Sequence, residues 1–469
     1  MPAGVRALND ALAAADIHPT VVSPAVPRAR VILVSLLSEQ AAFQFHLACA
    51  ANPLWAAPRK FTVLVGGFGM QNPWPVRHLA DWAFFGRAED QIAQIVTDLL
   101  HGRAPESESL LHLPDLPQPP GSVKVRQAYE LFDGETFRES FIGCPLKCKF
   151  CHYTFARRHV GGDHAYSRQQ GERGLSAMQY VQTDGYSRKP NKSSAEVTLP
   201  QLINWTLDYL PAQITVGLDG ASERLRFLFG KRILDDELQA AIRNHTRMIA
   251  DRSWRGGFLH LLDILGMPTE TADDREQMHR AIRAADPDTT GLQCYYIVVR
   301  TVPFKASPWT PLQWEAYHTR YDRRALAGRR ICRFRGATLS RNARGLTSTM
   351  HATYSLHVEG PGSQIIYALM ARHDGSPEAD RALKLIASPR FRRARHDRQL
   401  ADFRNAFGPF AARVLDALPL DADPPSGIAT AGVPLDTLRR MAAKSRDDAA
   451  LGRWRGKKSI MGATLPPAT

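Results

Sequence analysis

The sequence has few cysteines and no long apolar run, and both absences narrow what the protein can be. Its longest strongly apolar stretch, Val31–Leu37, is interrupted by Ser35, whereas a membrane-spanning helix needs about 20 apolar residues. The first residues, Met1–Ala15, carry Asp10 and contain no apolar core followed by a cleavage site, so we expect no signal peptide. These absences predict a cytoplasmic protein with no membrane partner.

The six cysteines are too few and too unevenly spaced for the disulfide framework of a secreted protein. Three of them fall within eight residues, at Cys144, Cys148 and Cys151, and the other three are scattered. A scattered cysteine is usually a small buried apolar side chain. The three clustered cysteines are therefore the candidate metal ligands.

The net charge of +14 comes mainly from arginine. Such a balance favours anionic partners, including nucleic acid. No recognisable nucleic-acid module accompanies the charge, so we favour a solvated basic surface over a nucleic-acid site. The 469 residues are too many for one compact core and predict two or three domains.

Residues 1–112 alternate strand-like and helix-like segments. The strand-like runs are Val31–Leu37, Phe61–Val65 and Asp81–Phe85, and Glu39–Ala51 suits a helix. After them, Ile92, Ile95, Val96, Leu99 and Leu100 recur at helical spacing. Because strands that alternate with helices form parallel sheets, we predict a small, doubly wound α/β domain. The segment Leu113–Gly121 contains four prolines and is typical of a linker.

The alternation resumes over residues 121–310, which predicts a complete or partial (β/α) barrel. Its candidate strands are Glu139–Gly143, Gln213–Leu218, Phe258–Leu265 and Gln293–Val299, and its candidate helices include Asp236–Asp251 and Ala272–Ala285. Residues 311–469 are expected to be mostly helical and to contribute to substrate recognition. Their end, from Asp421, is rich in Pro, Ala and Gly and predicts a mobile tail with one amphipathic stretch at Leu435–Ala443.

The clustered cysteines have the spacing C-x3-C-x2-C and follow a predicted strand. A tight loop with three thiolates can ligate three corners of a cubane cluster and leaves the fourth iron without a thiolate. A zinc site is the alternative, although it normally needs four ligands, and His152, next to Cys151, is poorly placed to complete it. Chance spacing is the remaining alternative. We favour the cluster.

With Pro145 after the first cysteine and Phe150 before the third, this segment resembles the radical S-adenosylmethionine (SAM) superfamily. The resemblance implies a [4Fe–4S] cluster held by Cys144, Cys148 and Cys151, with SAM chelated at the open iron. It also implies reductive cleavage of a carbon–sulfur bond of SAM, an external electron donor such as flavodoxin or ferredoxin, and Tyr153 as a residue near SAM.

Two later segments extend the resemblance. The segment from Ile214 to Arg226 resembles the mid-barrel strand and loop of relatives with cobalamin-type N-terminal domains, which implies that Asp219, Ser222 and Arg224 lie near SAM. An arginine at the carboxyl end of a strand suits a carboxylate. The alternative is a helix start with an ion pair.

The segment Leu265–Asp274 resembles the family turn Gly-Leu-Pro-x-Glu-Thr, in which Thr271 can cap the next helix. Glu270 would then lie at the catalytic face, as an acid near the reacting groups or as a ligand to the open iron. A structural carboxylate is the alternative. The stretch Phe304–Pro311 resembles the closing Phe-x-Pro-x-x-x-Thr-Pro signature, with Ala306 in place of its first proline.

Val63–Gly69 ends a predicted strand in glycines and resembles the later half of a cobalamin-binding domain. The resemblance implies that cobalamin is held by Gly66, Gly67, Asn72, Gly86 and Glu89. The motif Asp-x-His-x-x-Gly, whose histidine ligates cobalt in many such domains, is absent, and His46 is expected on a helix. The alternative is a domain that has lost cobalamin and serves only as a scaffold.

Together these resemblances imply a cobalamin-dependent radical SAM methyltransferase. It would act on a carbon centre of a small molecule or a peptide natural-product precursor, for example an indole ring carbon of tryptophan. A radical SAM enzyme that modifies RNA is one alternative, although the N-terminal domain has only Cys49 where methylthiolating relatives carry three cysteines. A non-catalytic iron–sulfur protein is the other.

Overall fold

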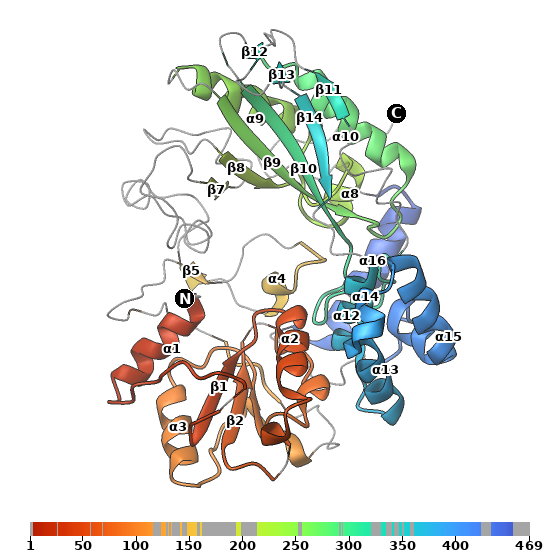
Figure 1. The fold of residues 1–469 in the computed structure, drawn as a ribbon. Coiled ribbons are helices and arrows are strands. Elements are labelled where there is room, and N and C mark those ends of the chain that lie inside the picture. Colours follow the sequence, from red (N-terminus) through yellow and green to blue (C-terminus); the bar gives the residue numbers. More distant parts are fainter. Residues whose placement is uncertain are drawn as a thin grey trace. The chain divides into compact units, whose positions relative to one another are not determined.

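The computed structural model forms two compact units, whose elements are labelled in Figure 1. Unit 1 combines residues 1–161, 305–319 and 360–443, and unit 2 combines residues 162–304, 320–359 and 444–469. The structure describes residues 3–115, 123–161, 194–197, 213–356 and 361–453, apart from 26, 57, 68, 128–129, 131–132, 134–140, 143–147, 157–159, 252–255, 290–291, 293, 320–329, 334–339, 342–346, 349–350 and 424–432.

Unit 1 is built on a four-stranded sheet with the order β1-β2-β3-β4. The strands are β1 (Val31–Ser35), β2 (Thr62–Gly66), β3 (Trp82–Phe84) and β4 (Leu110–His112). The first three are parallel and β4 is antiparallel to β3. The three parallel strands confirm the alternating pattern expected for the N-terminal region.

Helices cover this sheet because their apolar stripes need a partner surface. The helices are α1 (Ala3–Ala13), α2 (Glu39–Cys49) and α3 (Ile92–Leu100), with short 3-10 turns at Pro53–Trp55, Trp74–Val76 and Leu113–Asp115. The predicted stripe on α3 is confirmed: Ile95 and Val96 share one buried cluster with Leu12 of α1, Leu64 of β2 and Phe84 of β3.

The C-terminal helices belong to the same unit. They are α12 (Pro361–Arg372), α13 (Pro377–Ala387), α14 (Pro389–Arg393) and α15 (His396–Leu415), and α12 packs against α2 and α15. Tyr367 of α12 donates its hydroxyl hydrogen to Gln40 of α2, with 2.9 Å between the oxygens. A further helix, α16 (Leu435–Ala450), confirms the predicted amphipathic stretch and buries Leu438.

Unit 2 is built on a six-stranded sheet with the order β11-β14-β10-β9-β8-β7. Its strands are β7 (Ser194–Val197), β8 (Gln213–Gly217), β9 (Gly256–Leu265), β10 (Cys294–Pro303), β14 (His351–Leu356) and β11 (Arg330–Arg333). The strands β7, β8, β9, β10 and β14 are parallel in sequence order, and only β11 is antiparallel. Within the described residues the sheet stays open, with β7 and β11 at its edges.

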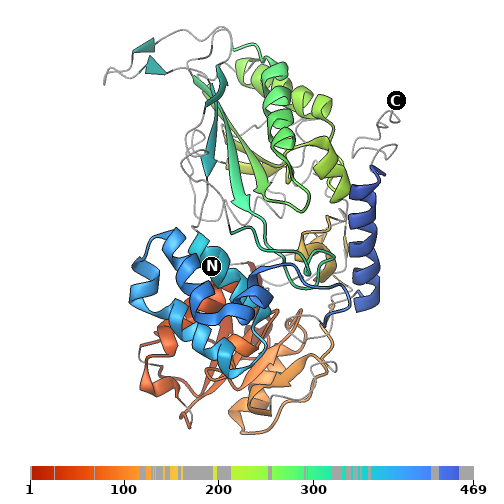
Figure 2. The same cartoon turned by 90° about the vertical axis from the view of Figure 1, so that its right-hand side faces the viewer.

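Helices α8 (Glu223–Leu228), α9 (Asp235–Asp251) and α10 (Ala272–Ala285) follow the strands of this sheet. Figure 2 shows the two long green helices, α9 and α10, on one side of the sheet. His245 of α9 lies 2.9 Å from the Tyr295 hydroxyl of β10. Tyr295, Ile297 and Val299 are fully buried, so these alternate residues of β10 face the helices.

The α/β class is confirmed, and two parts of the sequence prediction need correction in detail. A strand, β5 (Phe141–Ile142), lies within the expected Glu139–Gly143, but it pairs with β6 (Val160–Gly161) in a separate two-stranded sheet and not in the large sheet. Most of the regular structure described after Pro311 is helical, as expected, but β11 and β14 join the large sheet and β12 (Ser340–Arg341) and β13 (Thr347–Ser348) pair together. Among the described residues, no helix has the length and apolar character needed to span a membrane.

Candidate functional site

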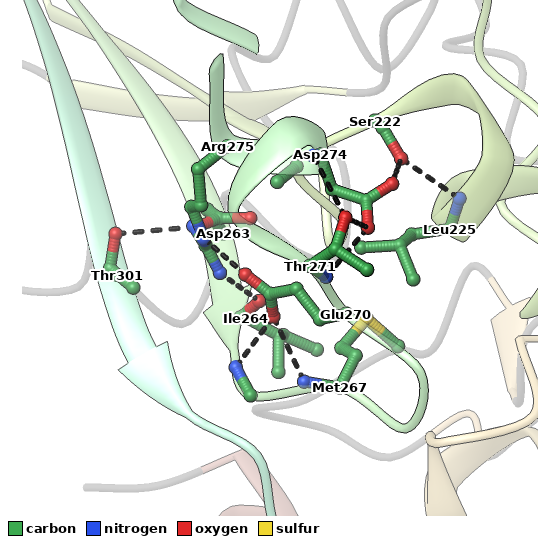
Figure 3. Close-up of polar contacts among 12 residues, drawn as sticks. Ser222, Leu225, Asp263, Ile264, Met267, Glu270, Thr271, Asp274, Arg275 and Thr301 are labelled. Atoms are coloured by element: carbon green, nitrogen blue, oxygen red, sulfur yellow. Dashed lines mark hydrogen bonds and ion pairs between the residues drawn. The ribbon is translucent and has the colours of Figure 1, made fainter. Parts of the chain in front are cut away.

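The parallel strands of unit 2 bring two loops to one edge of its sheet. The loop after β8 carries Asp219, Ser222 and Arg224, and the loop after β9 carries Glu270 and Asp274. Because β8 and β9 are hydrogen-bonded neighbours that run in the same direction, their carboxyl ends lie side by side. Ligands of parallel sheets usually bind at this edge, so these loops form the candidate site (Figure 3).

Asp274 links the two loops. Its carboxylate accepts hydrogen bonds from the Ser222 hydroxyl and from Arg224, whose Nε and Nη2 lie 3.1 and 2.6 Å from the two oxygens. Burial alone acts to raise the pKa of Asp274, but hydrogen bonds from Arg224, Ser222 and Thr271 outweigh it, so this pKa lies below its ordinary value. An ionised carboxylate thus holds together Ser222 and Arg224, the two residues that the family resemblance predicts near SAM.

The same carboxylate also begins helix α10. Thr271 is the N-cap, and its hydroxyl and the Asp274 side chain form a reciprocal capping box. Across from it, Ser222 caps α8 by accepting the backbone N–H of Leu225 at 3.2 Å. The Ser222 side chain is fully buried. Two helix starts are therefore fixed to each other by one buried acid (Figure 3).

Arg224 has no unused nitrogen. Besides its contacts with Asp274, its Nη1 and Nη2 donate to the hydroxyl and the carbonyl of Thr269 at 3.0 and 2.7 Å. Thr269 has a φ of +67°, which is rare for a threonine. Arg224 therefore stabilises the turn after β9. This geometry agrees with the alternative considered for Arg224 in the sequence, an ion pair at the start of a helix.

Glu270 closes that turn from the other side. One carboxylate oxygen accepts the backbone N–H groups of Gly266 and Met267, at 2.6 and 3.0 Å, and the other pairs with Arg275 of α10. Figure 3 shows the carboxylate pointing back onto its own turn. Both oxygens are engaged within the chain, which is the geometry of a structural carboxylate.

Arg275 joins Glu270 to Asp263, two residues before the end of β9. The Asp263 side chain is fully buried, and burial raises its pKa against the opposing effect of Arg275. Thr301 of β10 donates to Asp263 Oδ2 at 3.4 Å, and Oδ1 has no hydrogen-bond partner among the described residues. Arg275 therefore ties the carboxylate of Glu270 to a buried acid of β9.

Asp219 lies directly after β8 and pairs with Lys231, with 2.8 Å between Oδ2 and Nζ. Its φ of +52° is left-handed, which directs its side chain back toward Gly217. Its side chain retains 20% of its exposure, and that of Lys231 retains 16%. This pair is therefore partly accessible, as is Arg224, whose side chain is 23% exposed.

The cysteine segment lies in unit 1. Cys148 and Cys151 are on one turn that leads into helix α4 (His152–Ala156), and the Cys151 N–H donates to the Cys148 carbonyl at 3.1 Å. Cys148 is buried and Cys151 is partly exposed. Phe155 anchors α4 in an apolar cluster with Trp314 and Leu438. The spacing thus places two thiols on one short, anchored turn.

Cys144 and the side chain of Tyr153 lie outside the described residues. Within the described part, no group of at least three His, Cys, Asp or Glu residues is arranged to hold a metal ion. A triad that includes Cys144 would lie partly outside the described residues. The proposed ligand set therefore stays a prediction.

The predicted cobalamin residues are engaged in contacts within unit 1. A Cβ added to Gly67, whose φ is +99°, would lie 2.6 Å from the Leu36 carbonyl oxygen. A Cβ on Gly86, whose φ is +100°, would lie 2.2 Å from the Arg126 carbonyl oxygen. Only glycine tolerates such approaches. These two glycines thus serve contacts between the chain's own backbone segments, while Gly66 has only ordinary contacts.

Two polar residues of this prediction are also occupied. The Asn72 amide donates to the carbonyls of Ala371 and His373, at 3.2 and 2.9 Å, and its oxygen accepts the Trp74 N–H at 3.1 Å. Glu89 lies 3.0 Å from Arg87. Asn72 therefore ties the loop after β2 to the end of α12, and His46 is on helix α2 as expected.

Sequence reasoning missed the partners that organise the strand-end site. Asp274 was only the last residue of a matched turn, although the spacing Thr271-x-x-Asp274 is a capping-box signal. No local sequence pattern marks Arg275 as a site residue, because only the fold brings it next to Asp263 and Glu270. Neither the known protein-family models nor the curated proteins give a match to this chain.

Proposed function

We propose that this protein is a radical SAM enzyme whose [4Fe–4S] cluster is held by Cys144, Cys148 and Cys151. The observation that carries the proposal is the turn that places Cys148 and Cys151 three residues apart at the start of α4. Thiolates on such a turn suit a shared iron centre. Parallel strands that follow each other in sequence, with polar groups at their carboxyl ends, give further support.

The donor set fits a cluster better than a structural zinc site. Three thiolates satisfy three irons of a cubane, whereas zinc needs a fourth ligand. Cys49 is a poor fourth donor, because burial raises the pKa of its thiol to about 12. When bound, the cluster would supply an electron to the sulfonium of SAM.

The chain's own residues would position the reactants. In the proposal, unit 2 is the partial barrel, and the clamp of Asp274 with Ser222 and Arg224 fixes the loops that border SAM. Glu270 holds the turn after β9 by accepting two backbone N–H groups. These contacts exist before any ligand arrives, so they reduce the ordering cost of binding. Asp219 and Lys231 remain the partly exposed polar contacts.

The proposal includes methyl transfer to a carbon centre with cobalamin in the N-terminal domain. Gly67, Gly86 and Asn72 are already occupied by contacts within unit 1. A corrin would therefore have to be held by other groups of that domain. Cobalamin uptake by the full chain at saturating ligand tests this part separately, and no uptake would remove the cobalamin-dependent version alone.

Anaerobic reconstitution of the full chain with iron and sulfide tests the central proposal. The wild type should become brown, bind about four irons per chain and cleave SAM when reduced. Cys148→Ala and Cys151→Ala should each lose most of the iron and all cleavage. Cys49→Ala is the matched control, because its thiol is buried elsewhere in unit 1, and it should keep both. A chromophore that survives loss of all three clustered cysteines, or one zinc per chain in place of iron, contradicts the proposal.

A further inference from the structure

The sheet of unit 2 has one face away from its helices, and side-chain parity identifies the residues on it. Residues 295, 297, 299 and 301 of β10 are fully or almost fully buried. Two contacts show that this set faces the helices: Tyr295 meets His245 of α9, and Thr301 meets Asp263, which pairs with Arg275 of α10. Successive side chains of a strand point to opposite faces, so Arg300 lies on the face away from the helices.

The neighbours of Arg300 on that face are mostly apolar. In the sheet register Arg300 pairs with Leu262 of β9, and Val298 and Val302 flank it two positions away on its own strand. Val302 is 41% exposed, among the most exposed large apolar side chains of the chain. An apolar surface that stays partly exposed beside one charge is typical of a ligand-binding surface.

An aromatic pair lies farther along the same face. Phe258 and Tyr296 are stacked, with 5.1 Å between ring centroids and 16° between ring planes, and Phe258 is 39% exposed. Tyr296 precedes Arg300 by four strand residues, which corresponds to about 13 Å along the strand. The face thus presents an aromatic platform, an apolar strip that also carries the buried His260 of β9, and one guanidinium in a row.

Arg300 has no partner for its charge among the described residues. None of their carboxylate or carbonyl groups forms an ion pair or hydrogen bond with it, although its side chain is only partly exposed. Burial lowers the pKa of its guanidinium. An arginine stays ionised in proteins, and a partly desolvated, unpaired charge is costly. By contrast, Arg224 in the loop after β8 and Arg275 at the start of α10 each pair with a carboxylate.

We propose that Arg300 binds the carboxylate of the substrate, and that the rest of the substrate lies along the apolar strip toward Phe258 and Tyr296. The fork of the guanidinium matches a carboxylate through two parallel hydrogen bonds. Among the described residues of β8, β9 and β10, Arg300 is the only Lys or Arg on this face. A single cation suits a monoanion better than a phosphate dianion. The substrate class is therefore a carboxylic acid with an apolar or aromatic body. That the bound acid is a substrate rests on the proposed function.

A matched pair of probes tests this inference on the purified full chain without cluster or SAM. N-acetyl-L-tryptophan carries a carboxylate, and N-acetyl-L-tryptophanamide has the same body without the charge. Calorimetry should show about tenfold tighter binding of the acid, the expected effect of one charge-assisted bidentate contact. Arg300→Gln should abolish that preference, and Arg300→Lys, which keeps the charge but not the fork, should retain only part of it.

Arg247→Gln is the control, because Arg247 lies on α9, which covers the opposite face of the sheet. This variant should prefer the acid over the amide as strongly as the wild type does. Circular dichroism checks that each variant folds. If Arg300→Gln does not fold, Arg300→Lys serves as the test, and its preference for the acid over the amide should be reduced. Three results would overturn the inference: no measurable binding of the acid, equal binding of acid and amide, or a full preference in the Arg300 variants. None of them bears on the cysteines, whose variants are measured by iron content.

Discussion

Replacing Asp274 by asparagine should loosen the starts of helices α8 and α10 together. The Asp274 carboxylate accepts from the Ser222 hydroxyl, from two nitrogens of Arg224 and from the backbone and hydroxyl of Thr271. Asparagine is nearly isosteric but keeps only one acceptor oxygen, and its amide group would face donors. The substitution therefore removes the charge and leaves at least two donors without an acceptor.

The size of the effect follows from the burial of this contact. Removing one partner of a buried ion pair costs about 3–5 kcal/mol. The Asp274 side chain is 5% exposed and that of Arg224 is 23% exposed, which favours the lower end. A local destabilisation of about 3 kcal/mol corresponds to roughly a hundredfold faster opening.

Hydrogen exchange measured by mass spectrometry can follow this opening in peptides from the two helix starts. The adjacent Asp273 gives a matched control, because its side chain is 82% exposed and lies 3.5 Å from Arg280. Asp273→Asn should change exchange by less than about threefold, as expected for a surface pair. If both variants exchange alike, or if only α10 responds, Asp274 does not join the two loops and the clamp is refuted.

Two further predictions concern backbone strain and pH. Gly86→Ala should destabilise unit 1 by about 2 kcal/mol or more in urea unfolding, because the added Cβ meets the Arg126 carbonyl; Gly102→Ala, at a φ of +70° with open space around it, should cost only about 1 kcal/mol. Burial lowers the pKa of His245 from 6.5 to about 3, so between these values the unfolded chain binds more protons and stability must fall as the pH is lowered. His245→Gln should reduce that slope in hydrogen exchange of α9, and an unchanged slope would contradict the assignment.

Local signals in the sequence were enough to locate most helices and strands. Helix α10 was predicted at Ala272–Ala285 and is found there, because Thr271 caps it and its apolar residues recur at helical spacing. The parallel strands β8, β9 and β10 were each found within a few residues of the prediction. Buried strands have continuous apolar runs, which composition alone reveals.

The rest depended on contacts that are distant in sequence. Strand β14 lies among arginine-rich segments and was missed, although it pairs with β10 over six positions, from Tyr296 with His351 to Thr301 with Leu356. Strand pairing satisfies backbone groups whatever the local pattern. The site shows the same limit: Ser222, Arg224 and Glu270 were located by motif, but their partners Asp274 and Arg275 are set by the turn and the helix that follow β9.

The charged residues near the carboxyl ends of unit 2 fall into two groups, and this division bears on how a ligand can be held. Arg224 and Glu270 have their hydrogen-bonding groups satisfied inside the chain, so a ligand at either would first have to break contacts worth about 1–3 kcal/mol each. That cost would be subtracted from the binding free energy. Among the described residues Arg300 has no such contacts, and a ligand carboxylate would gain its full hydrogen-bonding capacity. Arg224 and Glu270, whose hydrogen bonds are made within the chain, are therefore expected to position the loops. Arg300 is expected to contact the ligand.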